Sequence, residues 1–194
     1  AKNWQSNLLV TDETEALPLL IDCGGDIRHA LHELDLTHRN IGCVYITHLH
    51  ADHVGGLEWF CFLSFFDPGY RGRGVNERPQ LMIQEDLVEK IWSNSLQGGL
   101  ESIQGKLMTL EDYFEVLPLS TTRGFRFGET DFHLVATDHV DNGSWIMSSY
   151  GLCFESNGIR VLFTGDVRRC DQLEERYAWA DVIFHDCEIL SLIH

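Results

Sequence analysis

The chain lacks two features that would place it outside the cytoplasm. It has no apolar run long enough to span a bilayer and no recognisable secretion signal. Its six cysteines include no Cys-x-x-Cys pair and are too scattered for a small disulfide scaffold, so we expect buried, reduced thiols. We therefore expect a cytoplasmic protein with no membrane partner.

Lysine is also scarce. Three lysines accompany eleven arginines, and with 30 acidic residues the formal net charge is −16. This balance opposes non-specific binding to nucleic acid, which is itself a polyanion. A nucleotide can still enter a metal-rich cleft, because bound cations reverse the local field. Arginine suits bidentate capture of phosphate, although codon usage of the lineage would give the same bias.

No repeat, low-complexity tract or linker interrupts the 194 residues, and we predict one domain over residues 1–194. Apolar runs predict strands at 17–22, 41–47, 79–84, 113–119 and 180–189 and hairpins at 125–137 and 150–166, with most neighbouring strands joined by tight turns. Asn157-Gly158 is a strong hairpin signal within this set. Helices are predicted over 26–35, 54–66, 85–96 and 170–180. The pattern indicates a mixed α/β domain with hairpin-rich sheets covered by helices.

One short stretch, THLHADHVGG (residues 47–56), contains three of the ten histidines together with an aspartate. His48 and His50 are two positions apart just beyond a predicted strand, so both imidazoles can point toward one metal ion. Asp52 and His53 follow where the chain turns into the next helix, and they can point toward a second ion. The two closing glycines let backbone segments approach closely, which also fits an ordinary tight turn.

Mixed histidine and carboxylate ligands are typical of Zn²⁺, Mn²⁺ or Fe sites. A solvated polar loop is the alternative for a lone His-x-His, and the whole six-residue pattern argues against it. A metal site needs further ligands, and two candidates follow apolar strands: His139 and Asp166. Taken alone, His139 is consistent with a surface-loop histidine, and Asp166 is consistent with an aspartate in an ordinary turn. With the cluster, both become candidate ligands, and Asp166 can bridge two ions because a carboxylate offers an oxygen to each.

The ordered set of LIDCGGD, THLHADHVGG, His139 and FTGD resembles the signature of the metallo-β-lactamase superfamily. The resemblance covers most of the chain and implies an α/β fold, the αββα sandwich, here shortened at both ends. It also implies two divalent metal ions, for which we favour zinc over manganese or iron. The resemblance implies three ligands for the first ion: His48, His50 and His139. It implies Asp52 and His53 as ligands of the second ion and Asp166 as the group that bridges the two.

The segment IFHDCEI is similar to the His-Glu-Ala-Thr segment of ribonuclease Z-like phosphodiesterases, with Asp186 in place of the glutamate. This resemblance places His185 near the scissile phosphate as a proton donor or oxyanion contact. The alternative is a buried strand histidine that bonds to backbone. The resemblance further makes Asp22 the group that holds a ligand imidazole, with a turn-capping role as its alternative.

Three features depart from the family pattern. The strand and Gly-rich turn usually found before QSNLLV are missing. The last histidine ligand of the second ion usually lies beyond the segment that ends here, and His194 is a candidate whose spacing from His185 is short. Only 27 positions separate His139 from Asp166, which leaves no room for the long tRNA-gripping arm common in ribonuclease Z.

The chemistry that these residues predict is hydrolysis. Two divalent ions would lower the pKa of a water toward roughly 7 and supply hydroxide at neutral pH. Asp52 would orient this nucleophile or take its proton, and His185 would stabilise charge on the leaving oxygen. We favour a phosphodiesterase that acts on a small phosphate-containing substrate, such as a small or cyclic nucleotide, or on short RNA.

Three alternatives stay open. The missing arm and the acidic charge argue against a tRNA 3′-processing endonuclease. FHDCEI and an arginine-bearing loop argue against a carbon-centred hydrolase of the same fold, acting on a lactone, thioester or β-lactam. A non-catalytic metal-binding protein would be expected to have lost ligands, whereas this set is nearly complete.

The arginine-bearing loop follows the histidine cluster and carries Arg71, Arg73 and Arg78 among glycines. Beside two metals, such a loop would bind a phosphate-containing substrate. The alternative is that these arginines pair with the surplus carboxylates of the chain. Tyr70 would either stack on a base or pack beneath the loop.

The helix predicted over 54–66 is rich in Phe and Trp and apolar nearly all round, which indicates a core position. A homodimer interface is the alternative for this helix.

Overall fold

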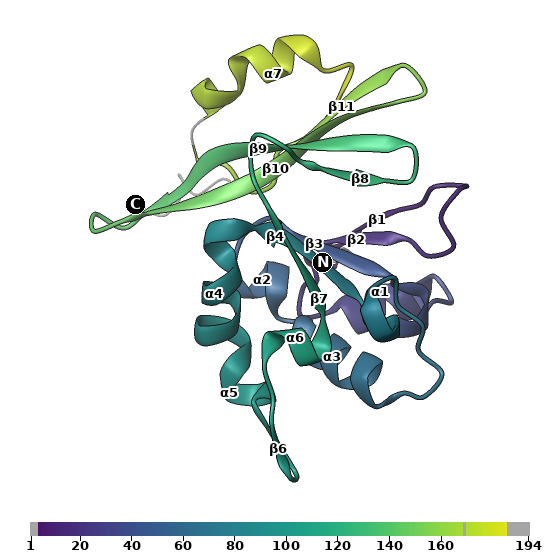
Figure 1. Cartoon of the computed structure of the whole chain (residues 1–194). Helices are drawn as coiled ribbons and strands as arrows, with labels where there is room; N and C mark the ends of the chain where they lie inside the picture. Colours follow the sequence, from purple (N-terminus) through teal and green to yellow (C-terminus); the bar gives the residue numbers. More distant parts are fainter. Residues whose placement is uncertain (1–3, 169, 186–194) are drawn as a thin grey trace. The chain divides into compact units, whose positions relative to one another are not determined.

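The computed structural model describes residues 4–168 and 170–185, which form two compact units (Figure 1). The first unit comprises Ala1–Ser120 and Phe127–Glu129, and the second comprises Thr121–Arg126 and Thr130–His194. Each unit has a five-stranded sheet of its own. Within the described ranges, no helix has both the length and the apolar character that a membrane span requires.

The sheet of the first unit has the strand order β1-β2-β3-β4-β7. These strands are β1 (Leu8–Val10), β2 (Leu19–Ile21), β3 (Cys43–Ile46), β4 (Gln80–Gln84) and β7 (Glu115–Leu119). Only β1 runs antiparallel to its neighbour, and the other three pairings are parallel. Because parallel neighbours need long crossover connections, the prediction of tight turns between most strands is wrong for this unit.

Short helical segments form the crossovers of the first unit. The α-helices are α1 (Ile27–Glu33), α2 (Ala51–Val54), α3 (Leu57–Phe66), α4 (Val88–Ile91), α5 (Gln97–Leu100) and α6 (Leu110–Tyr113). Between them lie η1 (His38–Asn40), η2 (Val75–Glu77), η3 (Glu85–Leu87), the π-helix η4 (Trp92–Leu96) and the hairpin strands β5 (Ser102–Ile103) and β6 (Lys106–Leu107). The core joins sheet residues such as Val44 and Leu81 to helix residues such as Leu57 and Phe60.

The helix predicted over 54–66 is interrupted before Leu57, so that α2 and α3 are separate. Its expected burial holds for Phe60 but is wrong at the carboxyl end, where Phe65 and Phe66 are 39% and 57% exposed. These two rings belong to the last turn of α3 and pack on each other, with centroids 4.9 Å apart.

The sheet of the second unit has the order β12-β11-β10-β9-β8. Its strands are β8 (Phe125–Phe127), β9 (Thr130–Asp141), β10 (Ile146–Ser156), β11 (Ile159–Phe163) and β12 (Val182–Phe184). The predicted hairpin between β10 and β11 is confirmed, and Asn157 and Gly158 take φ values of 53° and 75°. Both positive angles match the turn that an Asn-Gly pair favours.

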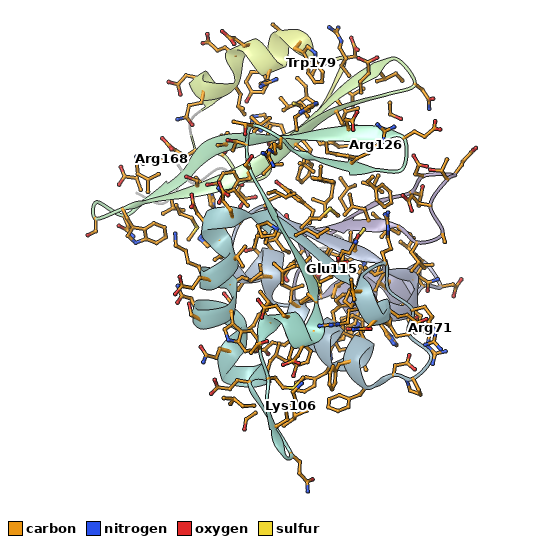
Figure 2. All side chains as sticks on the ribbon, viewed as in Figure 1. Arg71, Lys106, Glu115, Arg126, Arg168 and Trp179 are labelled. Carbon is orange, nitrogen blue, oxygen red and sulfur yellow. The ribbon has the colours of Figure 1, made fainter. Side chains whose placement is uncertain are left out.

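The segment η5 (Cys170–Leu173) leads into α7 (Glu174–Trp179), which lies on this sheet (Figure 1) and ends at Trp179 (Figure 2). Val135, Cys153, Leu162 and Leu173 form an apolar core cluster of this unit. The predicted last strand forms as β12 and pairs in parallel with β11. Its expected burial is wrong, because β12 is the edge strand of the described sheet and its three side chains are 41–50% exposed.

The thiols agree with the expectation of reduced cysteines. Cys23, Cys43, Cys61 and Cys153 are buried and free. The side chain of Cys170 and all of Cys187 lie outside the described residues.

Candidate metal centre

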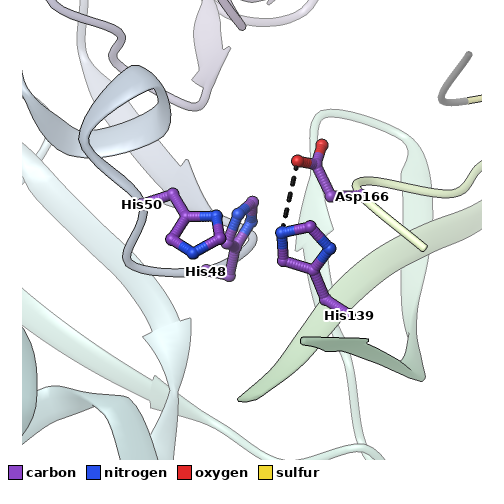
Figure 3. Close-up of side chains that lie close together, drawn as sticks. All are labelled: His48, His50, His139 and Asp166. Carbon is purple, nitrogen blue, oxygen red and sulfur yellow. Dashed lines mark ion pairs between the residues drawn. The ribbon is translucent and has the colours of Figure 1, made fainter. Parts of the chain in front are cut away.

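The first two histidines of the cluster follow the carboxyl end of β3. Thr47 is fully buried, and His48 and His50 follow it; the backbone of His50 is extended, at φ −68° and ψ 150°, just before α2. Their ligand nitrogens lie within 4.8 Å of each other, and the ring centroids are also 4.8 Å apart (Figure 3). The two-residue spacing therefore brings both imidazoles to one point, as the alternation of an extended segment predicts.

Helix α2 carries the next two candidates on its first turn. Asp52 Oδ2 lies 3.6 Å from His53 Nε2, and the Asp52 side chain is 51% exposed whereas His53 is only 2% exposed. One carboxylate oxygen and one imidazole nitrogen thus lie close together in the first unit. This is a donor pair that a divalent cation accepts.

Asp22 holds the imidazole of His53 from the other side. It follows β2, is 1% exposed, and its Oδ2 lies 2.7 Å from His53 Nδ1. The Thr47 backbone N–H donates to its Oδ1 at 2.9 Å, and the Thr47 hydroxyl donates to both oxygens. Burial raises the pKa of the Asp22 carboxyl, and the bonds from His53 and Thr47 oppose that rise. Ligand histidines commonly receive this support from a carboxylate on the second ring nitrogen.

Gly24 and Gly56 allow the backbone after β2 to pack closely against the start of α3. The N–H of Gly56 donates to Cys23 O at 2.8 Å. A Cβ on Gly56 would lie 2.4 Å from Gly24 O and 2.6 Å from Ile27 Cγ2. Close backbone approach is therefore the reason for glycine here, beyond any need for a turn.

The second unit brings two further candidates together. His139 lies on β9 and Asp166 follows β11, and Nε2 of the histidine is 3.5 Å from Oδ2 of the aspartate (Figure 3). The N–H of Arg168 donates to Asp138 O at 2.9 Å, which fixes the segment after β11 against β9. The two predicted strand-end candidates are thus neighbours, although 27 positions separate them in sequence.

His185 follows the carboxyl end of β12. Phe163 and Phe184 are in register in the parallel pair, and Thr164 N donates to Phe184 O at 3.0 Å. Asp166 and His185 therefore follow adjacent parallel strands at the same edge of the sheet. His185 Nε2 lies 2.6 Å from the hydroxyl of Tyr177, a residue that the sequence pattern did not single out.

The predicted substrate loop lies elsewhere in the first unit. Arg73 N donates to Gly42 O, and Cys43 pairs with Gln80, so the loop lies at the amino end of β3 whereas His48 follows its carboxyl end. Within the first unit, the structure does not bring Arg71, Arg73 and Arg78 to the histidine cluster.

Internal contacts hold this loop instead. The Arg73 guanidinium pairs with Glu15 at 2.9 Å and lies 5.0 Å from the Phe127 ring centre. Arg71 donates to Tyr70 O and pairs with Glu77 at 3.1 Å. Tyr70 is buried beneath the loop, the second of its two expected positions, and donates its hydroxyl to Ile41 O at 2.7 Å.

The residues in each unit have the chemistry of a transition-metal site. Imidazole nitrogens and carboxylate oxygens are the donors preferred by Zn²⁺ and acceptable to Mn²⁺ and Fe. The close pairs His48–His50 and His139–Asp166 fit such an ion in their own units. His194 and Asp186 lie outside the described residues.

Comparison with known proteins relates these features to one family. The family profile described as "Anti-Pycsar protein Apyc1" matches residues 1–194. A curated protein of that name from Paenibacillus harenae is 35% identical over 192 residues, which are 97% of this chain and 73% of the relative.

Two solved structures show the fold. The metallo-β-lactamase fold protein YhfI from Bacillus subtilis matches with a TM-score of 0.72 at 15% identity, over 97% of this chain and 66% of its own length. Human tRNase Z, short form, matches with a TM-score of 0.61 at 18% identity, over 95% of this chain and 72% of its own length. These similarities confirm the predicted metallo-β-lactamase fold.

Proposed function

We propose, from the premise that this chain belongs to the anti-Pycsar protein Apyc1 family of the metallo-β-lactamase superfamily, that it is a dinuclear metal-dependent phosphodiesterase acting on a small or cyclic nucleotide. The observation that carries the proposal is the set of close donor pairs at strand ends in both units. The match of one family profile to residues 1–194 supports the interpretation as a single domain.

The proposed assignment of metal ligands is the one that the family resemblance implies. In this assignment, His48, His50 and His139 would hold a first ion, Asp52 and His53 would hold a second, and Asp166 would serve both. The His48–His50 distance and the Asp52–His53 distance support this assignment within the first unit, and the His139–Asp166 distance supports it within the second. We favour zinc because the donors are mainly imidazole.

The chemistry divides between the bound ions and the side chains. When bound, two divalent ions polarise the phosphate and acidify a water. Asp52, whose carboxylate is half exposed, takes a proton from the attacking water. Asp22 fixes the ring of His53. His185 contacts the oxygen that leaves phosphorus.

A compact substrate is favoured over a tRNA precursor. The name of the relatives, anti-Pycsar protein, indicates removal of a cyclic nucleotide signal. The connection after the strand of His139 is short, because β9 ends at Asp141 and β10 begins at Ile146. It provides no arm to hold tRNA. Short RNA stays a second candidate, because it presents the same phosphodiester.

We also propose that the protein forms a homodimer and is located in the cytoplasm. The exposed pair Phe65 and Phe66 at the end of α3 supports a dimer contact. Sedimentation velocity at several protein concentrations tests it, and a single monomer species at all of them contradicts it.

A substrate panel tests the proposed function. Metal-loaded protein is compared on cyclic nucleotides of all four bases, tRNA precursor, bis(p-nitrophenyl) phosphate, p-nitrophenyl acetate and a lactone. We expect hydrolysis of the phosphodiesters, fastest for a cyclic nucleotide, and about two metal ions per chain by elemental analysis. Cleavage of only the carbon esters would overturn the proposal, as would absence of bound metal in chelator-free buffer.

A further inference from the structure

Tyr177 on α7 makes a short contact with His185. The tyrosine Oη lies 2.6 Å from His185 Nε2, and the two rings stack with centroids 5.7 Å apart at 28°. Both side chains are half-buried and both belong to the second unit. The distance is that of a strong hydrogen bond between a phenol and an imidazole.

The helix that carries Tyr177 is fixed to the sheet from two directions. Leu173, just before α7, is fully buried against Val135 and Leu162. Just after α7, the Arg160 guanidinium donates to both oxygens of Asp181 at 3.0 and 2.8 Å and lowers the pKa of that carboxyl to about 2.

The same arginine also touches the helix itself. The Arg160 guanidinium lies 5.8 Å from the ring centre of Trp179, the last residue of α7 (Figure 2). Since Arg160 belongs to β11, and β12 pairs with β11, the helix and the strand that precedes His185 share one support. The Tyr177–His185 contact is therefore made between two anchored elements.

The chemistry of the contact selects a tautomer. A neutral imidazole that accepts a hydrogen bond at Nε2 carries its proton on Nδ1. We propose that Tyr177 is a positioning residue, which donates its hydroxyl to His185 Nε2 and holds the imidazole as the Nδ1–H donor to the leaving oxygen of the substrate. This inference rests on the proposed phosphodiesterase function and adds a residue that the resemblance does not assign.

The hydrolytic step then balances without any change at Tyr177. The oxygen of the attacking water forms a bond to phosphorus, and the bond from phosphorus to the leaving oxygen breaks with its electron pair going to that oxygen. The Nδ1–H of His185 donates a hydrogen bond to the negative charge that develops there. The leaving oxygen takes a proton from bulk water, and Asp52 returns to bulk water the proton it took from the attacking water.

Leaving-group dependence separates positioning from a merely structural role. An alkoxide leaving group, as in a cyclic nucleotide, concentrates charge on one oxygen, whereas p-nitrophenolate spreads it over the ring. We expect Tyr177→Phe to lower kcat for the cyclic nucleotide by about 5- to 10-fold, the loss of one hydrogen bond, with KM unchanged. For thymidine 5′-p-nitrophenyl phosphate the loss should stay below about 2-fold.

Two further variants complete this kinetic test. Tyr177→Phe in a His185→Ala background should cause no additional loss, because the hydroxyl acts through the imidazole. Tyr113→Phe, which removes a hydroxyl bonded to Leu100 O in the first unit, is the matched control and should leave kcat unchanged. Equal losses on both substrates, or multiplicative effects of Tyr177→Phe and His185→Ala, would overturn the proposal.

An NMR measurement tests the contact independently of activity. In ¹⁵N-histidine-labelled protein, with the signals of His185 assigned by their loss in His185→Ala, we expect the Nδ1–H tautomer in the wild type and a shift toward Nε2–H in Tyr177→Phe. An Nε2–H tautomer in the wild type would contradict the positioning role even in an active enzyme. Absence of any phosphodiester hydrolysis would instead contradict the proposed function, which distinguishes the two failures.

Discussion

Asp22 Oδ2 and His53 Nδ1 lie 2.7 Å apart, and both side chains are almost completely buried. The contact joins the end of β2 to α2, and Thr47 donates further hydrogen bonds to the same carboxylate. Because the carboxylate engages Nδ1, the imidazole is oriented with Nε2 directed away from Asp22 and toward Asp52. A metal-ligand histidine needs this support to hold its ring in one orientation.

We predict that Asp22→Asn weakens both metal binding and folding. Asparagine keeps the shape but loses the charged acceptor for His53, so the affinity for Zn²⁺ should fall about 10- to 100-fold. Disturbing this buried hydrogen-bond network should also lower the free energy of unfolding by about 1–3 kcal/mol. Competition with a chelator and urea unfolding of the metal-free protein measure the two effects. Asp131→Asn, which removes the charge from an exposed ion pair with Arg126, is the control. An unchanged Zn²⁺ affinity in Asp22→Asn would refute the role of Asp22 in supporting the His53 imidazole.

We predict a pH-dependent contribution of Asp67 to stability. Its carboxylate accepts two hydrogen bonds from Arg39, at 2.6 and 2.8 Å, and lies 2.7 Å from His38 Nε2. The bonds from Arg39, with the Gly69 N–H, hold the pKa of Asp67 well below its usual range. Because the folded pKa is below the unfolded one, the stabilisation is complete above the unfolded value of about 3.9 and is lost as pH falls toward the folded value.

Comparison of the wild type with Asp67→Asn in urea checks this dependence. The difference in unfolding free energy should be constant above about pH 5 and should shrink toward about pH 2. A difference that does not change over this range would show that the carboxylate charge does not stabilise the fold.

We predict opposite effects for alanine at two glycines. A Cβ at Gly56 would meet the backbone oxygen of Gly24 at 2.4 Å, so Gly56→Ala should lower the unfolding free energy by about 1–3 kcal/mol. Gly98 lies in α5 with no atom within 4 Å of its Cβ position, and Gly98→Ala should raise stability by up to about 1 kcal/mol. Thermal unfolding of the two variants measures both effects. A stable Gly56→Ala protein would mean that the β2–α3 approach is not tight.

We predict that Arg73 acts through stability rather than substrate binding. Arg73→Ala removes the ion pair with Glu15 and the contact with Phe127, and should lower the unfolding free energy by about 1 kcal/mol. KM for a cyclic nucleotide should change less than about 2-fold, because the loop lies at the amino end of β3. Arg71→Ala, at an exposed pair with Glu77, is the control for stability. A rise in KM without loss of stability would restore the substrate role for Arg73.

Local patterns in the sequence predicted the elements that carry the candidate ligands. The apolar run at 41–47 corresponds to β3, and the alternation of an extended chain places His48 and His50 together. The Asn157-Gly158 pair has the positive φ values of its predicted turn. Strand β1 was missed, because its three residues carry no alternation and pair with β2 through tertiary contact.

Features that depend on register could not be predicted. Arg73 follows the histidine cluster in sequence, yet the parallel pairing of β3 with β4 places it at the other end of the strand. The contact of Tyr177 with His185 depends on how α7 crosses from β11 to β12. The eight-residue separation of Tyr177 and His185 is not a period of a helix or of a strand, so no sequence motif signals this contact.

The central claim is that this chain is a metal-dependent phosphodiesterase in which Asp52 takes part in the hydrolysis. The most direct measurement is ³¹P NMR of a 3′,5′-cyclic nucleotide incubated with the Zn²⁺- or Mn²⁺-loaded protein and with its Asp52→Ala variant. We predict conversion of the cyclic diester into a nucleoside monophosphate by the wild type, prevented by chelator and lost in Asp52→Ala. An unchanged ³¹P signal with metal bound, or equal conversion by Asp52→Ala, would contradict the account.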